Sequence, residues 1–274
     1  MGKLIIIASG KGGTGKTTLT SHVGAMLAEA GFLTVLVDAD AGFRNLDIAL
    51  GLESNIVYDY SDYINGGSEL DDVITKSIDQ ENLYFVAAPQ SVPTTDFDED
   101  KTSEFWENLK NRFEYVIADA PAGMGDGFMF AAKYADEAII VSLAETSSLR
   151  DADRVIAELE NLGVSTIRLI LNRIRPELIE NNILMNVDDC IDVLSIPILG
   201  LIPEDGAVME SMVKGTPLIK SDGYGAGTAF KNIAERLRGN NVQMMKFDDN
   251  RKKGLFSRIK NFFQSNNTRK EMIL

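Results

Sequence analysis

The chain has 274 residues, 45% of them hydrophobic and 25% charged, which is typical of one globular domain with a sizeable core. Its 41 acidic and 27 basic residues give a net charge of −14, so any nucleic acid or anionic lipid must meet a locally basic segment. The single cysteine, Cys190, excludes an internal disulfide, a cysteine-based metal cage and an iron–sulfur carrier.

Short runs rich in Val, Ile and Leu recur along the chain, and longer stretches with helical spacing separate them. The runs predict strands buried on both faces at 4–8, 34–37, 83–87, 115–118, 138–143, 168–171 and 198–202. The longer stretches predict helices at 17–30, 103–112, 148–162 and 226–237. This alternation predicts an α/β fold with a doubly wound, mostly parallel sheet, and ligand sites at the C-terminal ends of its strands.

The first apolar run is too short for the core of a signal peptide. No stretch approaches the roughly 20 apolar residues that a membrane-spanning helix needs. We therefore expect neither secretion nor a transmembrane segment. His22 and Trp106 are interpreted as packing residues.

A phosphate-binding motif lies between the first strand and the first helix. The pattern G-x-x-x-x-G-K-T is met by Gly10, Gly15, Lys16 and Thr17. Glycines let backbone N–H groups curl around phosphate oxygens, and the helix N-terminus adds partial positive charge. We expect Lys16 to reach the β- and γ-phosphates and Thr17 to ligate Mg²⁺; the alternative is a glycine-rich turn that holds a lysine by chance. The predicted nucleotide-binding residues of this phosphate loop are Gly10, Lys11, Gly12, Gly13, Thr14, Gly15, Lys16, Thr17 and Thr18.

Three carboxylates follow predicted strands. Asp38 and Asp40 come after the second strand, and Asp119 comes directly after the run 115–118. A carboxylate at such a strand end lies at the ligand edge of the sheet, so we assign Asp119 to Mg²⁺, directly or through water. Of the two carboxylates after the second strand, we place Asp38 nearer the metal and let Asp40 orient the attacking water. The alternative for either of these two residues is a cap on the next helix.

The sequence resembles the MinD/ParA family of deviant Walker A P-loop ATPases. The likeness rests on K-G-G-T-G-K-T-T from Lys11, V-D-A-D-A-G-F-R-N-L-D at 37–47 and D-A-P-A-G at 119–123, and it extends over nearly the whole chain. It implies Mg²⁺-dependent ATP hydrolysis and a homodimer formed with ATP. It further implies that Lys11 crosses the dimer interface to the partner's nucleotide, as an arginine finger does. The alternative is that Lys11 is a solvated surface charge.

The resemblance also assigns residues to the base of the nucleotide. Asn172 and Arg173 would frame it, with the Asn172 amide selecting adenine, and Pro203 would belong to the same nucleotide site. An Asn-Arg pair at a strand end can equally be structural, so that alternative stays open. Residues 148–154 and the helix that follows are candidates for a partner surface.

The chain ends in a basic, amphipathic segment. We divide it into an ATPase domain at 1–238, a linker at 239–250, an amphipathic helix at 251–264 and a polar extension at 265–274. Residues 251–263 carry five positive charges and no negative one. On a helix the apolar side chains gather within an arc of about 120°, and the flanking cations can reach lipid headgroups. We therefore predict membrane contact by Leu255, Phe256, Arg258, Ile259, Lys260, Phe262 and Phe263. The alternatives are a last core helix or a tail that binds another protein.

Together these features predict an ATP-driven switch that regulates the placement of cell division. It would be cytoplasmic, and peripheral on the cytoplasmic face of the cell membrane, where it binds anionic lipid. The resemblance implies recruitment of a MinC-like division inhibitor, and a MinE-like activator or a polar anchor that sets its pattern. The rivals are a ParA-type ATPase that positions DNA or cargo, a flagellar-number regulator of the same family and a metabolic P-loop enzyme. The acidic body disfavours DNA.

Overall fold

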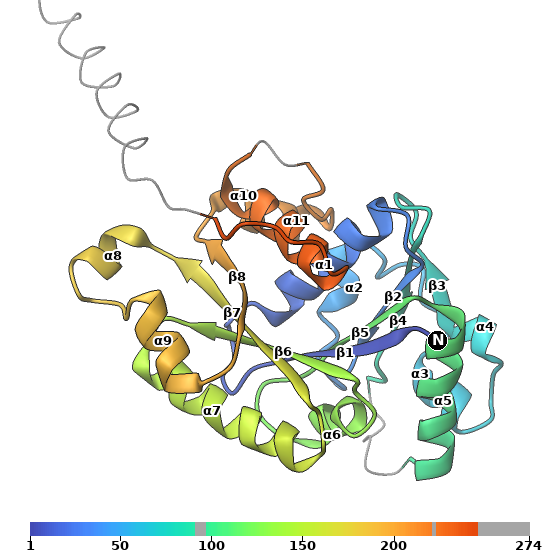
Figure 1. The fold of residues 1–274 in the computed structure, drawn as a ribbon. Helices are drawn as coiled ribbons and strands as arrows, with labels where there is room; N and C mark the ends of the chain where they lie inside the picture. Colours follow the sequence, from blue (N-terminus) through green and yellow to red (C-terminus); the bar gives the residue numbers. More distant parts are fainter. Residues whose placement is uncertain (91–96, 221–222, 246–274) are drawn as a thin grey trace, which may run out of the picture. The chain divides into compact units, whose positions relative to one another are not determined.

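In the computed structural model of the protein, the described residues form an eight-stranded sheet in the order β3-β4-β2-β5-β1-β6-β7-β8 (Figure 1). The structure describes residues 1–90, 97–220 and 223–245. Every neighbouring pair is parallel except β3 and β4, which are antiparallel. The strands are β1 (Lys3–Ala8), β2 (Thr34–Asp38), β3 (Ile74–Lys76), β4 (Leu83–Val86), β5 (Tyr115–Asp119), β6 (Glu137–Leu143), β7 (Thr166–Ile174) and β8 (Ile198–Pro203).

The predicted α/β fold with a mostly parallel sheet is confirmed. Each predicted apolar run forms a strand, and β1, β2 and β5 at the centre are almost entirely buried, as expected for a sheet covered on both faces. Strand β3 was not predicted, because its three residues are half-exposed and carry no long apolar run.

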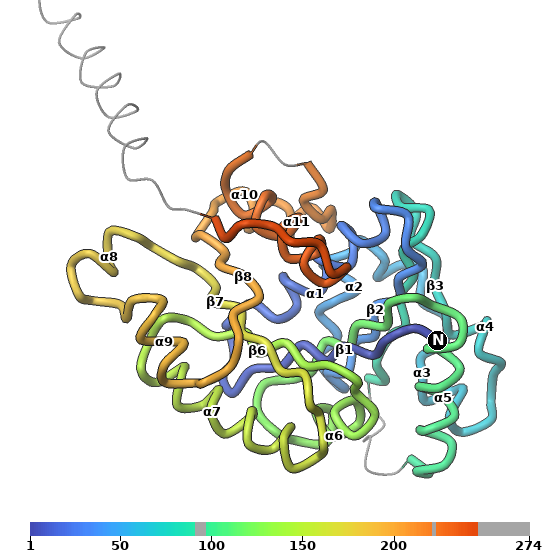
Figure 2. The backbone as a smooth tube through the Cα atoms, in the orientation of Figure 1, coloured from blue at the N-terminus to red at the C-terminus, as the bar shows by residue number. Residues whose placement is uncertain are grey.

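Helices cover both faces of this sheet. Figures 1 and 2 show α1, α10 and α11 gathered on one face and α6 and α7 on the other. Helix α1 packs against α11 and α2, and α10 packs against α2. The helices are α1 (Lys16–Glu29), α2 (Leu46–Leu50), α3 (Tyr60–Ile64), α4 (Leu70–Val73), α5 (Glu99–Arg112), α6 (Asp126–Ala132), α7 (Thr146–Asn161), α8 (Pro176–Glu180), α9 (Val187–Leu194), α10 (Gly206–Lys214) and α11 (Gly225–Leu237).

One carboxylate holds the beginnings of α10 and α11. Asp205 Oδ1 accepts a hydrogen bond from Ala207 N at 3.0 Å, and its Oδ2 accepts one from Ala226 N at 2.9 Å. At the other end of α10, the backbone of Gly215 lies against that of Gly51, so closely that a Cβ on Gly215 would lie 2.8 Å from the Gly51 Cα. Helix α10 is thereby tied both to α11 and to α2.

The compact body extends past α11, to Met244. The Arg236 guanidinium donates hydrogen bonds to the carbonyls of Leu199, Val242 and Gln243, which ties the chain after α11 to β8. The predicted amphipathic helix at 251–264 and the extension at 265–274 lie outside the described residues, as do residues 246–250 of the predicted linker. None of the helices in the described part of the chain has the length and apolar character to cross a bilayer.

Candidate functional site

The phosphate loop lies between β1 and α1, as its sequence predicts. Gly13 and Gly15 adopt positive φ angles of 77° and 100°, which other residues rarely adopt. A Cβ added to Gly12 or Gly13 would meet nothing within 4 Å, so there is open space beside this stretch of the loop. Gly10 is the opposite case, because its Cβ would lie 2.2 Å from the Asp151 carbonyl oxygen of α7. The loop is therefore fixed on one side by α7 and open on the other.

Lys16 and Thr17 begin helix α1 at the bottom of this loop. The buried Lys16 ammonium donates a hydrogen bond to Ser9 Oγ at 3.0 Å, and Ser9 Oγ donates to the Lys11 carbonyl at 2.8 Å. The Thr17 hydroxyl donates to Asp119 Oδ2 at 2.6 Å, which joins the phosphate loop to the end of β5. The structure thus brings together Thr17 and Asp119, two of the three residues predicted to serve the metal.

Asp38 lies beside Asp119, at the adjacent strand end. The register of β2 and β5 pairs these two residues directly. Asp38 accepts backbone hydrogen bonds from Asp40 N at 2.9 Å and from Asn45 N and Leu46 N at 3.2 Å each. It therefore also holds the beginning of α2, so the helix-capping alternative describes part of its role.

Burial controls the electrostatics of these carboxyl groups. Burial and the neighbouring Asp119 charge raise the pKa of Asp38 to about 7. Burial raises the pKa of Asp119 to about 6, although Thr17 and Lys16 oppose the change. The pKa of Asp40 is also raised by burial and lowered in part by Lys16. A cation placed between these groups would favour their charged forms, which is what a bound Mg²⁺ supplies.

The residues present fit a Mg²⁺–nucleotide. The open glycine backbone and Lys16 can bind phosphate oxygens, and Thr17 and Asp119 place two oxygen ligands at the same point. In the described part of the chain, no group of three or more His, Cys, Asp or Glu side chains is arranged to hold a metal ion. Mg²⁺ does not need such a group, because it takes phosphate oxygens and waters as its remaining ligands.

Lys11 lies apart from this arrangement. Its side chain is 44% exposed, and its ammonium lies 3.9 Å from Glu145 Oε2 at the end of β6. The two lysines of the loop therefore point in different directions. Lys16 points into the phosphate loop, and Lys11 points outward at the edge of the loop.

The residues assigned to the base lie at the ends of β7 and β8. Asn172 Nδ2 donates to the Thr14 carbonyl at 2.7 Å, and Asn172 Oδ1 accepts from Arg173 N at 2.9 Å. Asn172 therefore holds the phosphate loop in this structure, and its selection of adenine stays a prediction. Arg173, at a positive φ of 53°, lines a cavity of about 220 Å³ with Glu145, Arg175 and Glu204. Pro203 closes β8 in the same region.

Comparison with known proteins identifies the family. Residues 5–218 match the model of the CobQ/CobB/MinD/ParA nucleotide binding domain, which is more than half of the chain. The chain belongs to the MinD/ParA family of nucleotide-binding proteins. Over 248 residues it is 42% identical to the septum site-determining protein MinD of Synechocystis sp., which covers 90% of this chain and 93% of that protein.

Solved structures of the same family agree with the fold. The MinC:MinD cell division protein complex of Aquifex aeolicus contains a chain that is 37% identical, with a TM-score of 0.83, over 89% of this chain and 99% of that one. The septum site-determining protein MinD of Pyrococcus horikoshii, solved with Mg-ADP, is 31% identical with a TM-score of 0.77, over 86% and 96% of the two chains. The resemblance to the MinD/ParA family found in the sequence is confirmed.

The sequence did not reveal every residue of this MinD/ParA site. Thr20 donates to Asp119 Oδ1 at 3.1 Å, so Asp119 receives two hydroxyl groups from one face of α1. Its position three residues after Thr17 is the signal that could have found it, because such residues share a helix face. Glu145 could also have been found from the sequence, because, like Asp119, it is a carboxylate that follows a buried strand.

Proposed function

We propose that this protein is an ATP-dependent switch that controls where a cell divides. ATP and Mg²⁺ join two copies face to face, and the paired C-terminal segments hold the dimer on the cytoplasmic face of the cell membrane. Hydrolysis of ATP releases the dimer, so the output of the reaction is a change of place. The family membership and the MinD relatives support the coarser part of this proposal, a septum site-determining nucleotide-binding protein.

The different placement of the two loop lysines carries the proposal. Lys16 is buried and bonded within the cradle, whereas Lys11 points outward from the same loop toward Glu145. A cation held at the rim can reach the phosphates of a second copy, and there it would stabilise charge only once two copies meet. This makes hydrolysis depend on dimerisation.

The C-terminal segment supplies the membrane step. Its five cations and its apolar stripe have the composition of an interfacial helix. One such helix binds weakly and reversibly, while two linked copies gain about 10²- to 10⁴-fold in effective affinity. Dimerisation is therefore sufficient to turn membrane attachment on.

A MinC-like division inhibitor is the proposed protein partner, since a solved MinC:MinD complex is among the similar structures. Within residues 148–154 of the predicted partner surface, Arg150, Asp153 and Arg154 are exposed, whereas Ser148, Leu149 and Ala152 are buried. In that block, only the three exposed side chains are offered as contacts. A MinE-like activator or a polar anchor would set the pattern in the cell.

The test is co-sedimentation with liposomes that contain anionic lipid, in the presence of ATP, ADP or no nucleotide. We expect the wild-type protein to sediment with ATP and to stay in solution with ADP. Lys11→Ala and a chain that ends at Asn250 should both stay in solution. Lys101→Ala is the matched control, because Lys101 is an exposed lysine paired with Glu104, far along the chain from the phosphate loop.

Equal sedimentation of wild type with ATP and with ADP would contradict the nucleotide coupling. Sedimentation of the truncated chain would contradict the role of the tail. Retention on DNA that weakens steeply with salt, without liposome binding, would favour the ParA-type alternative.

A further inference from the structure

Tyr60 begins helix α3, and its backbone is fixed beside the nucleotide site. Asp59 caps the helix by accepting from Ser61 N at 2.9 Å. The Tyr60 backbone N–H donates to the Ala87 carbonyl at 3.2 Å, directly after β4. Strands β2 and β4 pair in register up to Val37 and Val86. Tyr60 is therefore anchored at the strand end that neighbours Asp38.

The Tyr60 ring is fully buried among three phenylalanines. It stacks on Phe130 of α6 with ring centroids 4.6 Å apart and an interplanar angle of 18°. Phe97 meets it edge-on at 5.9 Å, and Phe105 lies at the same distance in a tilted arrangement. Such close packing leaves the ring one position, which fixes the direction of its hydroxyl group.

The Tyr60 hydroxyl is buried and has no hydrogen-bond partner among the described residues. Buried phenol groups usually find a partner, because an unpaired one loses its hydration without replacement. A phenylalanine would fill the same space without this penalty. Burial and the charges of Asp38, Asp59 and Asp40 raise the pKa of Tyr60, so the group keeps its proton and stays a donor.

The segment that contains Asp38 and Asp40 is held against α6, the helix that carries Phe130. The Ala39 carbonyl oxygen lies so close to α6 that a Cβ on Gly127 would be 2.3 Å from it. Further along, Gly42 N donates to the Pro89 carbonyl at 3.0 Å, which keeps the loop beside the chain that follows β4. Residues 38–42 thus lie between α6 and the anchoring point of Tyr60.

We propose that Tyr60 is a positioning residue of the nucleotide site, whose hydroxyl donates a hydrogen bond to the Asp38–Asp40 segment when a triphosphate is bound. The bond holds Asp40 in the place where it orients the attacking water. This inference rests on the proposed ATP hydrolysis. The inference goes beyond the proposed function because Tyr60 lies outside the phosphate loop and is not one of the three carboxylates.

The test compares Tyr60→Phe with Tyr63→Phe in the full-length protein. Tyr63 lies on the same helix, and its hydroxyl already accepts a hydrogen bond from Asn108 Nδ2 at 2.9 Å. We would measure thermal unfolding without nucleotide, the affinity for ADP and for a slowly hydrolysed ATP analogue with Mg²⁺, and the steady-state rate of ATP hydrolysis.

For Tyr60→Phe we expect a nucleotide-free unfolding temperature equal to or above that of the wild type. Its affinity for the ATP analogue should fall about fivefold, as the loss of one hydrogen bond predicts, with ADP affinity within twofold. Its kcat should fall about tenfold. Tyr63→Phe should unfold at a slightly lower temperature, with kcat and both affinities unchanged.

Two outcomes would overturn the inference. Unchanged analogue affinity and kcat in Tyr60→Phe would show that the hydroxyl takes no part. A larger drop in unfolding temperature than in Tyr63→Phe would show that it already has a stabilising partner without nucleotide. Absence of hydrolysis by the wild type would instead contradict the proposed function, so the two failures are distinguishable.

Discussion

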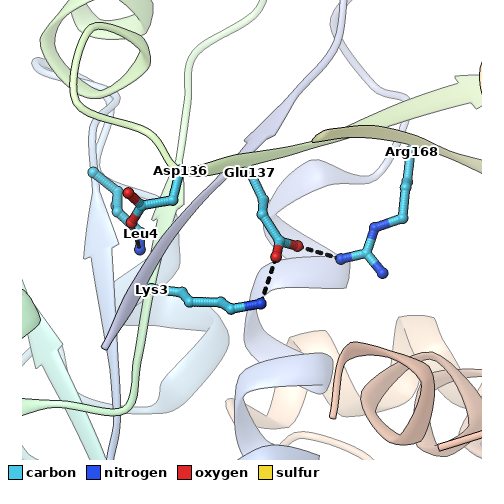
Figure 3. A network of polar contacts seen from close by, with 5 residues as sticks. All are labelled: Lys3, Leu4, Asp136, Glu137 and Arg168. Carbon is cyan, nitrogen blue, oxygen red and sulfur yellow. Dashed lines mark hydrogen bonds and ion pairs between the residues drawn. The ribbon is translucent and has the colours of Figure 1, made fainter. Parts of the chain in front are cut away.

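The two edges of the sheet handle charge in opposite ways. At the N-terminal ends of the strands, Glu137 accepts from Lys3 at 2.6 Å and also pairs with Arg168 (Figure 3). Beside it, Asp136 accepts from Leu4 N at 2.7 Å and lies 3.8 Å from the Lys110 ammonium. Each of these five side chains has a partner of opposite charge or a backbone N–H.

At the C-terminal ends, by contrast, acidic groups lie next to one another. Asp38 and Asp119 are paired across β2 and β5, and burial raises the pKa of both. Burying like charges is unfavourable without a cation. The charges of the first edge are therefore satisfied in the free protein, whereas we expect a bound Mg²⁺–nucleotide to satisfy those of the second.

The largest expected effect is that of Lys16→Ala at the ligand edge. We expect ATP hydrolysis to fall about 10²- to 10³-fold, because a preorganised charge on the phosphates is lost. Lys3→Ala is the matched control at the opposite edge and should hydrolyse ATP at the wild-type rate. A steady-state phosphate-release assay checks both. Equal losses in the two variants would break the distinction between the edges.

His22 is a buried group whose pKa is shifted although it is not part of the nucleotide site. Burial lowers its pKa to about 4, while it contacts the Thr18 carbonyl at 2.7 Å and Ser211 Oγ at 2.9 Å. Between pH 6.5 and 4, His22 binds a proton in the unfolded chain but not in the folded one. The free energy of unfolding therefore falls as the pH drops through this range. His22→Gln should remove about 3 kcal/mol of this fall. Urea titrations at both pH values measure the difference, and parallel curves for the two proteins would contradict it.

Asp119→Asn should separate stability from function at the ligand edge. Because the folded-state pKa of Asp119 is raised to about 6, the native protein binds more protons than the unfolded one between about pH 4 and 6, and stability falls as the pH rises through that window. A neutral amide avoids this loss, so we expect the nucleotide-free variant to gain about 1–2 kcal/mol at pH 8 and nothing at pH 4.

In the same variant, the Mg²⁺ concentration for half-maximal hydrolysis should rise at least about tenfold, since a ligand of the ion is lost. Unchanged Mg²⁺ dependence in a titration of the initial rate would show that Asp119 does not serve the metal.

The smallest expected effect has the opposite sign. Glu137→Gln should lower stability by about 1 kcal/mol, because Lys3 and Arg168 lose their shared partner. Its Mg²⁺ dependence should match that of the wild type. A gain in stability would mean that the edge opposite the ligand is also strained by its charges. Chemical unfolding at pH 8 measures this variant beside Asp119→Asn.

The fold and the phosphate loop could be predicted because their signals are local. Strand β1 contains a continuous apolar run at 4–8, and the phosphate loop with its glycines follows it. The same holds for Asp119, whose place at the end of β5 follows from the chain alone.

The features that escaped prediction depend on contacts that no local sequence pattern marks. Helix α2 begins where Asp38 accepts from Leu46 N, and α3 begins where Tyr60 N meets the Ala87 carbonyl. Neither helix has more than five residues, too few to be marked by periodicity. The ion pair of Lys11 with Glu145 likewise joins residues far apart in sequence.

Asp205 bonds to the first turns of both α10 and α11. The two ends of the segment of about 20 residues between these points therefore lie close together. The entropy of closing such a loop grows only slowly with its length. Gly223 is exposed within it, and a Cβ there would meet nothing within 4 Å. A fluorescent reporter domain grafted beside Gly223 should therefore be tolerated, which gives a way to follow the protein in living cells while both chain ends stay native.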